Sequence, residues 1–274
     1  MKDFSLEIIF SIIGVGAASG LFYNDNALYL ISDDSNYLYK YAMLTGALDK
    51  ILLNVDDDML EQLPKKHKRD LEALAFEAPN FYIYGSGSTN SGRRDSRITV
   101  DLDSRQSQLE NLTPLFRGLQ EKFDVDIDNF NIEGAIHHAG EVYLFNRGNG
   151  PKGQNGIFKL TAEDSTFIPI TLRSSSSMKF GFTDAVLVGD VIYFVATAED
   201  SNSVYEDGNI QGSMLGKLSF PSLELESYIT ISETHKFEGI TLYIEDAQEI
   251  TFLLCEDRDN DVIESAIYQL TISK

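Results

Sequence analysis

The sequence predicts an all-β protein, a five-bladed β-propeller formed by a single domain that spans residues 1–274. Three observations support this prediction: apolar strands separated by tight turns, a pattern that recurs five times, and one unused strand at the N-terminus. The aromatic residues are 17 Phe and 13 Tyr with no Trp, a composition typical of strand-rich structure. A β-sandwich with accidental internal similarity is the alternative fold.

Each copy of the repeat starts with a short strand that opens on Ser, Glu or Thr. A tight turn and a strongly apolar strand containing Tyr or Phe follow. The opening residues are Ser19, Glu72, Glu133, Thr183 and Glu238. The copies are about 50 to 60 residues apart and carry mainly strand and turn signals, which is typical of propeller blades with four antiparallel strands each.

The remaining strands of each blade show period-two alternation of apolar and polar residues, as expected where one face is buried. The third strands are predicted at residues 37–42, 97–102, 156–160, 214–220 and 266–271. Fourth strands follow in the first four copies, but the fifth copy ends without one. The segment Ser5 to Ile13 (SLEIIFSII) is predicted to supply it, which closes the ring and removes two exposed strand edges.

The N-terminal segment has a second interpretation as a signal peptide. Residues 8–18 (IIFSIIGVGAA) are long enough for its apolar core, and 16–18 resemble a cleavage site. Asp3 and Glu7 precede this core beside only Lys2, whereas a signal peptide requires net positive charge there. We therefore expect a closing strand and a cytoplasmic protein, with export as the alternative.

Two short helices are predicted between blades. Residues 56–63 (DDDMLEQL) form an amphipathic segment with acidic residues in its first turn and a proline, Pro64, after it. Residues 113–122 form the second. Both segments lie in connections, so neither interrupts the ring.

The composition restricts the partners of the protein. With 43 acidic and 22 basic residues the net charge is −21, which disfavours nucleic acids and anionic membranes and suits divalent cations. No apolar run is long enough to span a membrane. The single cysteine, Cys255, excludes an intrachain disulfide framework and a cysteine-based zinc site, and its apolar surroundings predict a buried thiol.

The five repeat-opening residues are the candidate metal ligands. The first strand of each propeller blade lines the central channel, so Ser19, Glu72, Glu133, Thr183 and Glu238 are predicted to form a ring around the axis. Three crowded carboxylates repel one another unless they are protonated or neutralised. Oxygen ligands without His or Cys favour Ca²⁺. Alternatively, the glutamates accept hydrogen bonds from backbone amides of neighbouring blades.

The order of these residues resembles the calcium-activated nucleotidases, or soluble apyrases, which are five-bladed propellers with one Ca²⁺ in the channel. The similarity rests on short motifs such as DLEALAF, IEGAIHH and FEGITL and on their spacing over the whole ring. It implies Ca²⁺-dependent hydrolysis of a nucleotide or another phosphate ester. The repeats also resemble phytase-like and esterase-like bacterial propellers.

This chain departs from the apyrase pattern at two places. The family has an Asp-Asp-Arg-Thr-like stretch in its first blade, where this sequence has residues 33–36 (DDSN) without the arginine. The family has paired arginines in its third blade, where this sequence has Arg147 followed by Gly148. Both departures concern the proposed hydrolysis more than the fold or the metal.

The loops after the second strands are polar and are predicted to gather on one face around the channel mouth, where loops on a rigid scaffold usually carry function. In the hydrolytic hypothesis, arginine forks neutralise the developing charge while an aspartate orients water. The candidate catalytic residues are Asp33, Asp34, Arg93, Arg147 and Arg258. The expected ligand is a small anionic molecule, and the sequence leaves the oligomeric state open.

A non-enzymatic propeller that binds a ligand or a protein and holds a structural cation is the main alternative function. Propellers host both enzymes and binding proteins, so the fold does not decide between them. A sugar-processing or lectin propeller is a weaker alternative, because the chain has no Trp for stacking on sugars.

Overall fold

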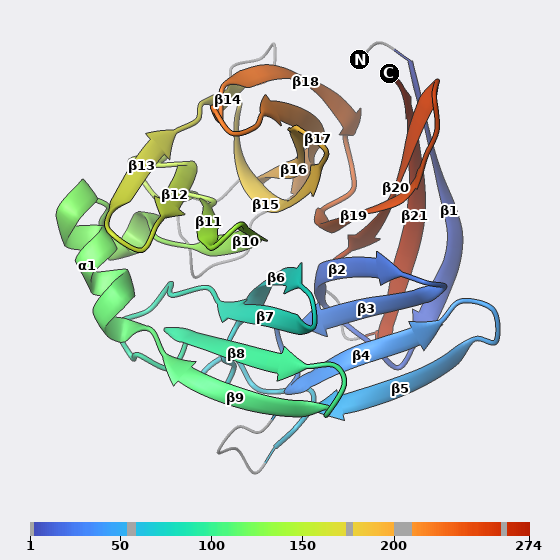
Figure 1. Cartoon of the computed structure of the whole chain (residues 1–274), viewed down its shortest axis with the longest axis horizontal. Helices are drawn as coiled ribbons and strands as arrows, with labels where there is room; N and C mark the ends of the chain where they lie inside the picture. The colour runs from blue at the N-terminus through green and yellow to red at the C-terminus, as the bar shows by residue number, and fades with distance from the viewer. Residues whose placement is uncertain (1–2, 54–58, 174–177, 200–209, 259–261) are drawn as a thin grey trace.

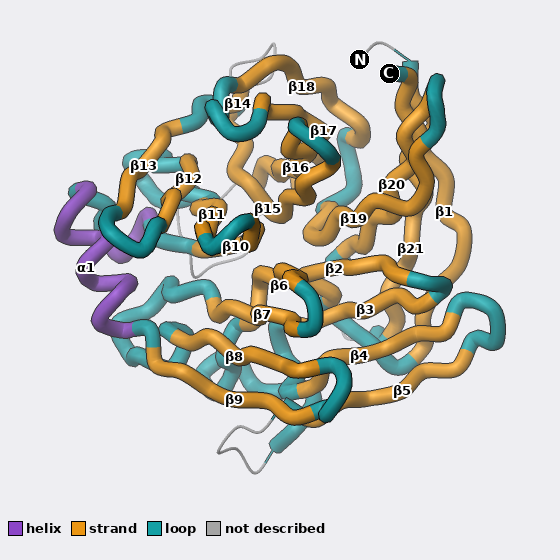
Figure 2. Tube along the Cα trace, in the orientation of Figure 1, coloured by secondary structure: helices purple, strands orange, loops and turns teal. Residues whose placement is uncertain are grey.

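The computed structural model describes residues 3–53, 59–173, 178–199, 210–258 and 262–274. Their strands form five antiparallel sheets arranged around a central axis, as Figures 1 and 2 show. This arrangement confirms the predicted five-bladed β-propeller. No helix in the described part of the chain is long and apolar enough to cross a membrane.

The strands follow one another outward in each blade. Blade 1 holds β2 (Ala18–Asn24), β3 (Ala27–Ser32), β4 (Tyr37–Ala42) and β5 (Ala47–Leu52). Blade 2 holds β6 (Leu71–Glu77), β7 (Asn80–Gly85), β8 (Ser96–Asp101) and β9 (Gln106–Asn111). Blade 3 holds β10 (Ile132–His138), β11 (Glu141–Asn146), β12 (Gly156–Leu160) and β13 (Ser165–Pro169).

The last two blades depart from this simple order. Blade 4 holds β15 (Lys179–Val188), β16 (Val191–Glu199), β17 (Ile210–Ser219), β18 (Leu225–Ser232) and a short extra strand, β14 (Leu172–Arg173), which pairs with β15. Blade 5 holds β19 (Phe237–Glu245), β20 (Glu249–Glu256), β21 (Glu264–Ser273) and β1 (Phe4–Ile13). The sequence predicted four strands per blade and therefore missed β14.

The ring closes through the two ends of the chain. β1 pairs antiparallel with β21 from Phe4 opposite Ile272 to Ile13 opposite Glu264. The N-terminal strand therefore completes the last blade, as predicted, and the two termini lie side by side in Figure 1. This pairing covers the edge that β21 would otherwise expose.

A bulge interrupts the inner strand of every blade at the residue that opens the repeat. In blade 1 the register with β3 shifts between Ala18 and Gly20, so Ser19 falls out of the ladder. The same shift occurs at the four equivalent positions, which are Glu72, Glu133, Thr183 and Glu238. Because a bulge redirects the side chain away from the normal alternation of the strand, these five residues share one structural position in the blades.

Five hydrophobic clusters hold the blades together, and each lies between two neighbouring blades. Phe145 of blade 3 and Phe194 of blade 4 belong to one such cluster, and Tyr193 and Phe252 join blades 4 and 5 in the next. The cluster between blades 5 and 1 contains Cys255, which is fully buried as predicted. The apolar faces of all five sheets are thus covered by adjacent blades, which fixes the inner strands around the channel.

One of the two predicted helices is present. Helix α1 (Thr113–Phe123) packs Phe116 and Leu119 into the protein, and a short 3₁₀ helix, η1 (Ile127–Asn129), follows it. The other prediction covered residues 56–63, of which 56–58 lie outside the described residues and Met59–Leu63 form no helix. The main chain there bonds to a neighbouring loop, since Asn36 N donates to the Leu60 carbonyl and Leu63 N donates to that of Asp34.

Candidate metal centre

The three glutamates of the predicted ring converge on the channel. Arg147 Nη1 lies 3.1 Å from Glu133 Oε1 and 3.8 Å from Glu238 Oε1, so one guanidinium joins carboxylates of blades 3 and 5. The charges of Glu133 and Glu238 also raise the pKa of Glu72 in blade 2. The bulges therefore bring together side chains that are far apart in the sequence.

The two hydroxyl residues of the ring bind the main chain. Ser19 Oγ donates a hydrogen bond to the Ala17 carbonyl at 3.2 Å. Thr183 Oγ1 donates to the Phe237 carbonyl at 2.6 Å, which links blade 4 to blade 5. Both hydroxyl groups thus have structural partners in the main chain.

Basic side chains neutralise two of the three glutamates. Besides Arg147, Lys236 Nζ lies 3.1 Å from Glu238 Oε1 and 3.6 Å from Asp257 Oδ2. Asn131 Nδ2 donates to Glu133 Oε1 at 2.6 Å. Sequence reasoning missed Lys236, which directly precedes β19 and lies two residues before Glu238.

Glu72 is the carboxylate of the ring with the least compensation. Within the described residues its side chain makes no hydrogen bond or ion pair. Its pKa is raised well above the usual range, first by burial and then by the negative charges of Glu133, Asp70 and Glu238. The charge of Lys68 acts on Glu72, but Lys68 pairs directly with Asp33, so within the described residues no basic side chain bonds to Glu72 itself.

Two aspartates lie beside Glu72 and form an acidic cluster with it. One carboxylate oxygen from each of Asp33, Asp70 and Glu72 lies within 4.8 Å of the others. Asp33, in the turn after β3, accepts a hydrogen bond from Lys68 Nζ at 2.5 Å. Burial nevertheless raises the pKa of Asp33 to about 7, because it outweighs the attraction of Lys68. We call these three carboxylates the Asp33–Asp70–Glu72 cluster.

Asp70 was not among the residues expected from the sequence. It precedes β6 with a φ of 56°, in the left-handed region that Asp tolerates better than most side chains. Its carboxylate accepts a hydrogen bond from Ser86 Oγ at 2.6 Å and forms an ion pair with the buried Arg94. Its position directly before the LEALAF motif was the available signal.

The donor set of this cluster fits a hard divalent cation. The ligand atoms are carboxylate oxygens, without His or Cys, which is the chemistry that Ca²⁺ and Mg²⁺ prefer. Ser86 and Ser88 bond to Asp70 and hold it in place. A cation bound here would share the Asp33 carboxylate with Lys68.

The predicted catalytic residues do not form one group. Asp34 accepts a hydrogen bond from Ser32 Oγ at 2.7 Å. Arg93 Nε donates to the His67 carbonyl at 2.7 Å, and Arg258 Nε donates to Glu256 Oε2 at 2.9 Å. Of the five candidates, Asp33 lies in the acidic cluster and Arg147 in the ring of glutamates, where it neutralises protein carboxylates.

The fold and this site define a five-bladed propeller whose channel is lined by buried charged residues. The chain belongs to the family described as a family of unknown function (DUF6929), which matches residues 14–272. No curated protein sequence matches it.

Several solved structures share the fold. The glutaminyl cyclase of Myxococcus xanthus is 8% identical, with 97% of this chain and 96% of that chain covered and a TM-score of 0.50. The Malassezia sympodialis allergen Mala s 1 is 12% identical over 95% of each chain, with a TM-score of 0.53. A luciferin-regenerating enzyme is 10% identical over 98% of this chain and 95% of that chain, with a TM-score of 0.50. At such identities the similarity supports the propeller fold alone, and the apyrase resemblance stays a prediction.

Proposed function

We propose that this propeller binds a divalent cation, Ca²⁺, through the Asp33–Asp70–Glu72 cluster in its channel. The observation that carries the proposal is the approach of three carboxylates to within 4.8 Å, one of which, Glu72, has no ion pair or hydrogen bond within the described residues. Crowded carboxylates either take up protons or bind a cation. A cation with several oxygen ligands would satisfy all three at once.

Burial and charge support this assignment. The pKa values of Asp33 and Glu72 are both raised, chiefly by burial, so the ionised cluster is costly in the absence of a cation. Lys68 supplies one positive charge to Asp33, and Arg94 supplies one to Asp70. A divalent cation would therefore add its charge mainly at Glu72, with water and hydroxyl oxygens completing its six to eight ligands.

Hydrolysis of a phosphate ester is the second candidate function. Lys68 and Arg94 beside the acidic cluster favour it, because a phosphoryl group bound to the cation would also meet basic side chains. A water molecule oriented by Asp33 or Asp34 would attack phosphorus, the bond from phosphorus to the ester oxygen would break, and the alcohol would leave with a proton. Arg147 and Arg258 contribute less to this candidate than expected, since both pair with protein glutamates.

Calcium titration tests the cation site. We expect one Ca²⁺ per chain by isothermal titration calorimetry after treatment with a chelator, and we expect Glu72→Gln to weaken binding at least about tenfold. Glu249→Gln is the matched control, because Glu249 is an exposed glutamate at the start of β20 and its loss should leave Ca²⁺ affinity unchanged. Wild-type protein that binds no Ca²⁺, or equal weakening in both variants, would reject the site.

A second assay separates hydrolysis from binding. Phosphate release is measured from a panel of nucleotides and phosphate monoesters, with Ca²⁺ and with chelator. Release that requires Ca²⁺ supports the hydrolytic candidate. Release that is insensitive to chelator rejects the metal mechanism, and no release from protein that binds Ca²⁺ supports the non-enzymatic alternative.

A further inference from the structure

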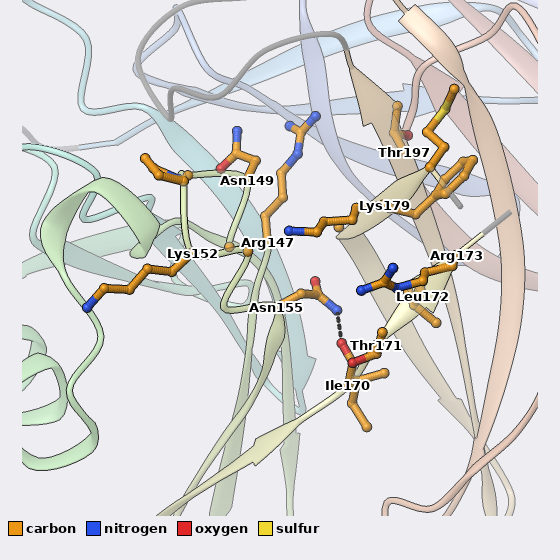
Figure 3. A pocket seen from close by; sticks show the side chains of 17 residues that line it. Arg147, Asn149, Lys152, Asn155, Ile170, Thr171, Leu172, Arg173, Lys179 and Thr197 are labelled. Atoms are coloured by element: carbon orange, nitrogen blue, oxygen red, sulfur yellow. Dashed lines mark hydrogen bonds between the residues drawn. The ribbon is translucent and has the colours of Figure 1, made fainter. Parts of the chain in front are cut away.

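A cavity of about 470 Å³ lies between blades 3 and 4, beside the channel. The loop after β11 lines one side, and the paired strands β14 and β15 line the other, as Figure 3 shows. This volume is in the range of small-molecule sites. The loop after β11 is one of the polar loops expected to carry function, but strand β14 was not predicted.

The lining of this cavity is basic, in contrast to the rest of the chain. The protein has 43 acidic and 22 basic residues, yet the described residues at the cavity include four basic residues and no Asp or Glu. The basic residues are Arg147, Lys152, Arg173 and Lys179. A local concentration of basic residues in a protein of net charge −21 favours an anion at this place.

Arg173 and Lys179 face each other across the β14–β15 pair. They are directly opposite in register, and both are exposed. Neither makes a hydrogen bond or an ion pair within the described residues. Like charges directly opposite on paired strands are destabilising. An anion between the two side chains would remove this cost.

The other two basic residues form ion pairs with protein carboxylates. Arg147 pairs with Glu133, and Lys152 Nζ lies 2.6 Å from Asp126 Oδ2. In Figure 3 Lys152 points away from the cavity, whereas Lys179 and Arg173 extend toward the loop that carries Asn149. The charge available to a ligand therefore comes from β14 and β15.

The loop opposite Lys179 approaches it closely through a glycine. Gly153 has a φ of 63°, and a Cβ atom at this position would lie 3.0 Å from Lys179 Nζ. A side chain there would displace the ammonium group. Because Gly153 has no side chain, the Lys179 ammonium group can lie at the cavity wall.

Apolar residues also line the cavity. Ile170, Leu172 and Phe180 are buried residues of this lining. Asn155 Nδ2 donates a hydrogen bond to the Ile170 carbonyl at 2.9 Å. An apolar surface next to two cations suits a ligand with a charged group attached to an uncharged body.

We propose that this cavity binds a small organic dianion, a phosphate monoester or a dicarboxylate, through Arg173 and Lys179. Two neighbouring cations match a charge of about −2, which a phosphate monoester approaches at pH 7. The Arg173 guanidinium offers the planar fork that fits phosphate and carboxylate oxygens, and Lys179 adds a point charge. The site does not depend on the channel cation, since it shares no residue with the Asp33–Asp70–Glu72 cluster.

Binding is tested by calorimetry at low ionic strength in the presence of chelator, so that failure of the cation site does not affect the outcome. The probes are phenyl phosphate, inorganic phosphate and phthalate. We expect at least one organic dianion to bind more tightly than inorganic phosphate, and we expect Arg173→Gln and Lys179→Gln each to weaken it about tenfold. The comparison of phenyl phosphate with phthalate identifies which dianion the site prefers.

Arg105→Gln and Lys122→Gln are the matched controls. Both residues are basic and exposed, and each pairs with an aspartate away from the cavity, Arg105 with Asp49 and Lys122 with Asp164. They change the net charge by the same amount, so their affinities should equal that of the wild type. Equal weakening in the controls, or no binding of any probe to the wild type, overturns the proposal.

The ligand-free protein provides a second measurement. Lys179→Gln removes the repulsion from Arg173, so its melting temperature at low ionic strength should exceed that of the wild type. The difference should shrink in 1 M salt, where charges are screened over about 3 Å. A lower melting temperature for Lys179→Gln would show that Lys179 has a stabilising partner in the protein and would count against an anion site.

Discussion

Arg147 Nη1 lies 3.1 Å from Glu133 Oε1 and 3.8 Å from Glu238 Oε1, so a single guanidinium connects blades 3 and 5 across the channel. All three side chains are about 5% exposed. The protein therefore supplies its own cation to two of the three ring glutamates. Arg147, which was expected to bind a substrate anion, is therefore a structural component of the ring.

Arg147→Met should destabilise the protein by about 3 to 5 kcal/mol at pH 7, because it leaves buried carboxylates without their cation. The free energy of unfolding is measured by urea denaturation. Arg147→Met combined with Glu133→Gln should recover part of the loss, since the second change removes one of the abandoned charges. A loss below about 1 kcal/mol in the single variant would mean that Arg147 is not needed to neutralise the ring.

Glu72→Gln should have opposite effects on stability and on calcium binding. The pKa of Glu72 is raised in the folded protein, so its ionisation at neutral pH opposes folding. The glutamine variant should melt at a higher temperature than the wild type in chelator at pH 8. It should also lose most of the stabilisation that Ca²⁺ gives to the wild type.

Glu238→Gln is the comparison for this prediction, because Glu238 is neutralised by Lys236 and Arg147. Burial also raises the pKa of Glu238, but Lys236 and Arg147 oppose this shift, so Glu238→Gln should raise the melting temperature in chelator less than Glu72→Gln does. If Glu72→Gln instead lowers the melting temperature, Glu72 has a stabilising partner and the excess negative charge at the cluster is absent.

The acidic cluster should also make the calcium-free protein less stable as the pH rises. The pKa of Asp33 is raised from 3.8 to about 7 in the folded state, so the folded protein holds a proton that the unfolded chain has lost. Its contribution is fully present below pH 3.8 and is lost as the pH rises through 7. Asp33→Asn should flatten this part of the stability profile, measured by thermal melting in chelator between pH 5 and 8. An unchanged slope would contradict the raised pKa.

The fold was predictable because its signals are local and repeated. Each blade opens on a Ser, Glu or Thr before a tight turn and an apolar strand, and these residues coincide with the five bulges. The missing fourth strand of the last copy also indicated β1 correctly. Periodicity and the number of strands are properties of the sequence itself.

The charge pairs were not predictable, because they depend on the distances between blades. Lys236 belongs to no motif and Asp70 only begins the DLEALAF motif, so their roles follow from the contacts with Glu238 and Glu72. The basic cavity depends on the two-residue strand β14, which is too short to give a periodic signal. Residues 59–63 do not form the predicted helix, because their main chain forms hydrogen bonds with the loop that contains Asn36. Local helix propensity does not encode such a contact.

His137 should make the protein less stable in mild acid. It stacks on Tyr82 with ring centroids 3.9 Å apart, and its Nε2 lies 2.7 Å from the Tyr84 hydroxyl. Burial, with a smaller effect of Arg97, lowers its pKa from 6.5 to about 4. The stabilising contribution of the neutral ring is complete above pH 6.5 and is lost as the pH falls toward 4.

The expected loss over this interval is on the order of 3 kcal/mol. His137→Phe should keep the stacking and remove the pH dependence, which is measured by urea denaturation between pH 4 and 7. His138→Phe, at the exposed neighbouring position, is the control and should retain the wild-type dependence. Identical profiles for His137→Phe and the wild type would show that His137 is not the titrating group.

The closure of the ring by β1 makes a last prediction, which compares two isoleucines of the same strand. Ile12 is 1% exposed and belongs to the cluster between blades 5 and 1, whereas Ile8 is 54% exposed. Ile12→Ala should lower the free energy of unfolding by about 2 to 4 kcal/mol through the cavity it creates. Ile8→Ala should cost less than about 1 kcal/mol, since little apolar area is lost. Because both variants make the same change four residues apart, equal effects in urea denaturation would mean that β1 does not seal the last blade.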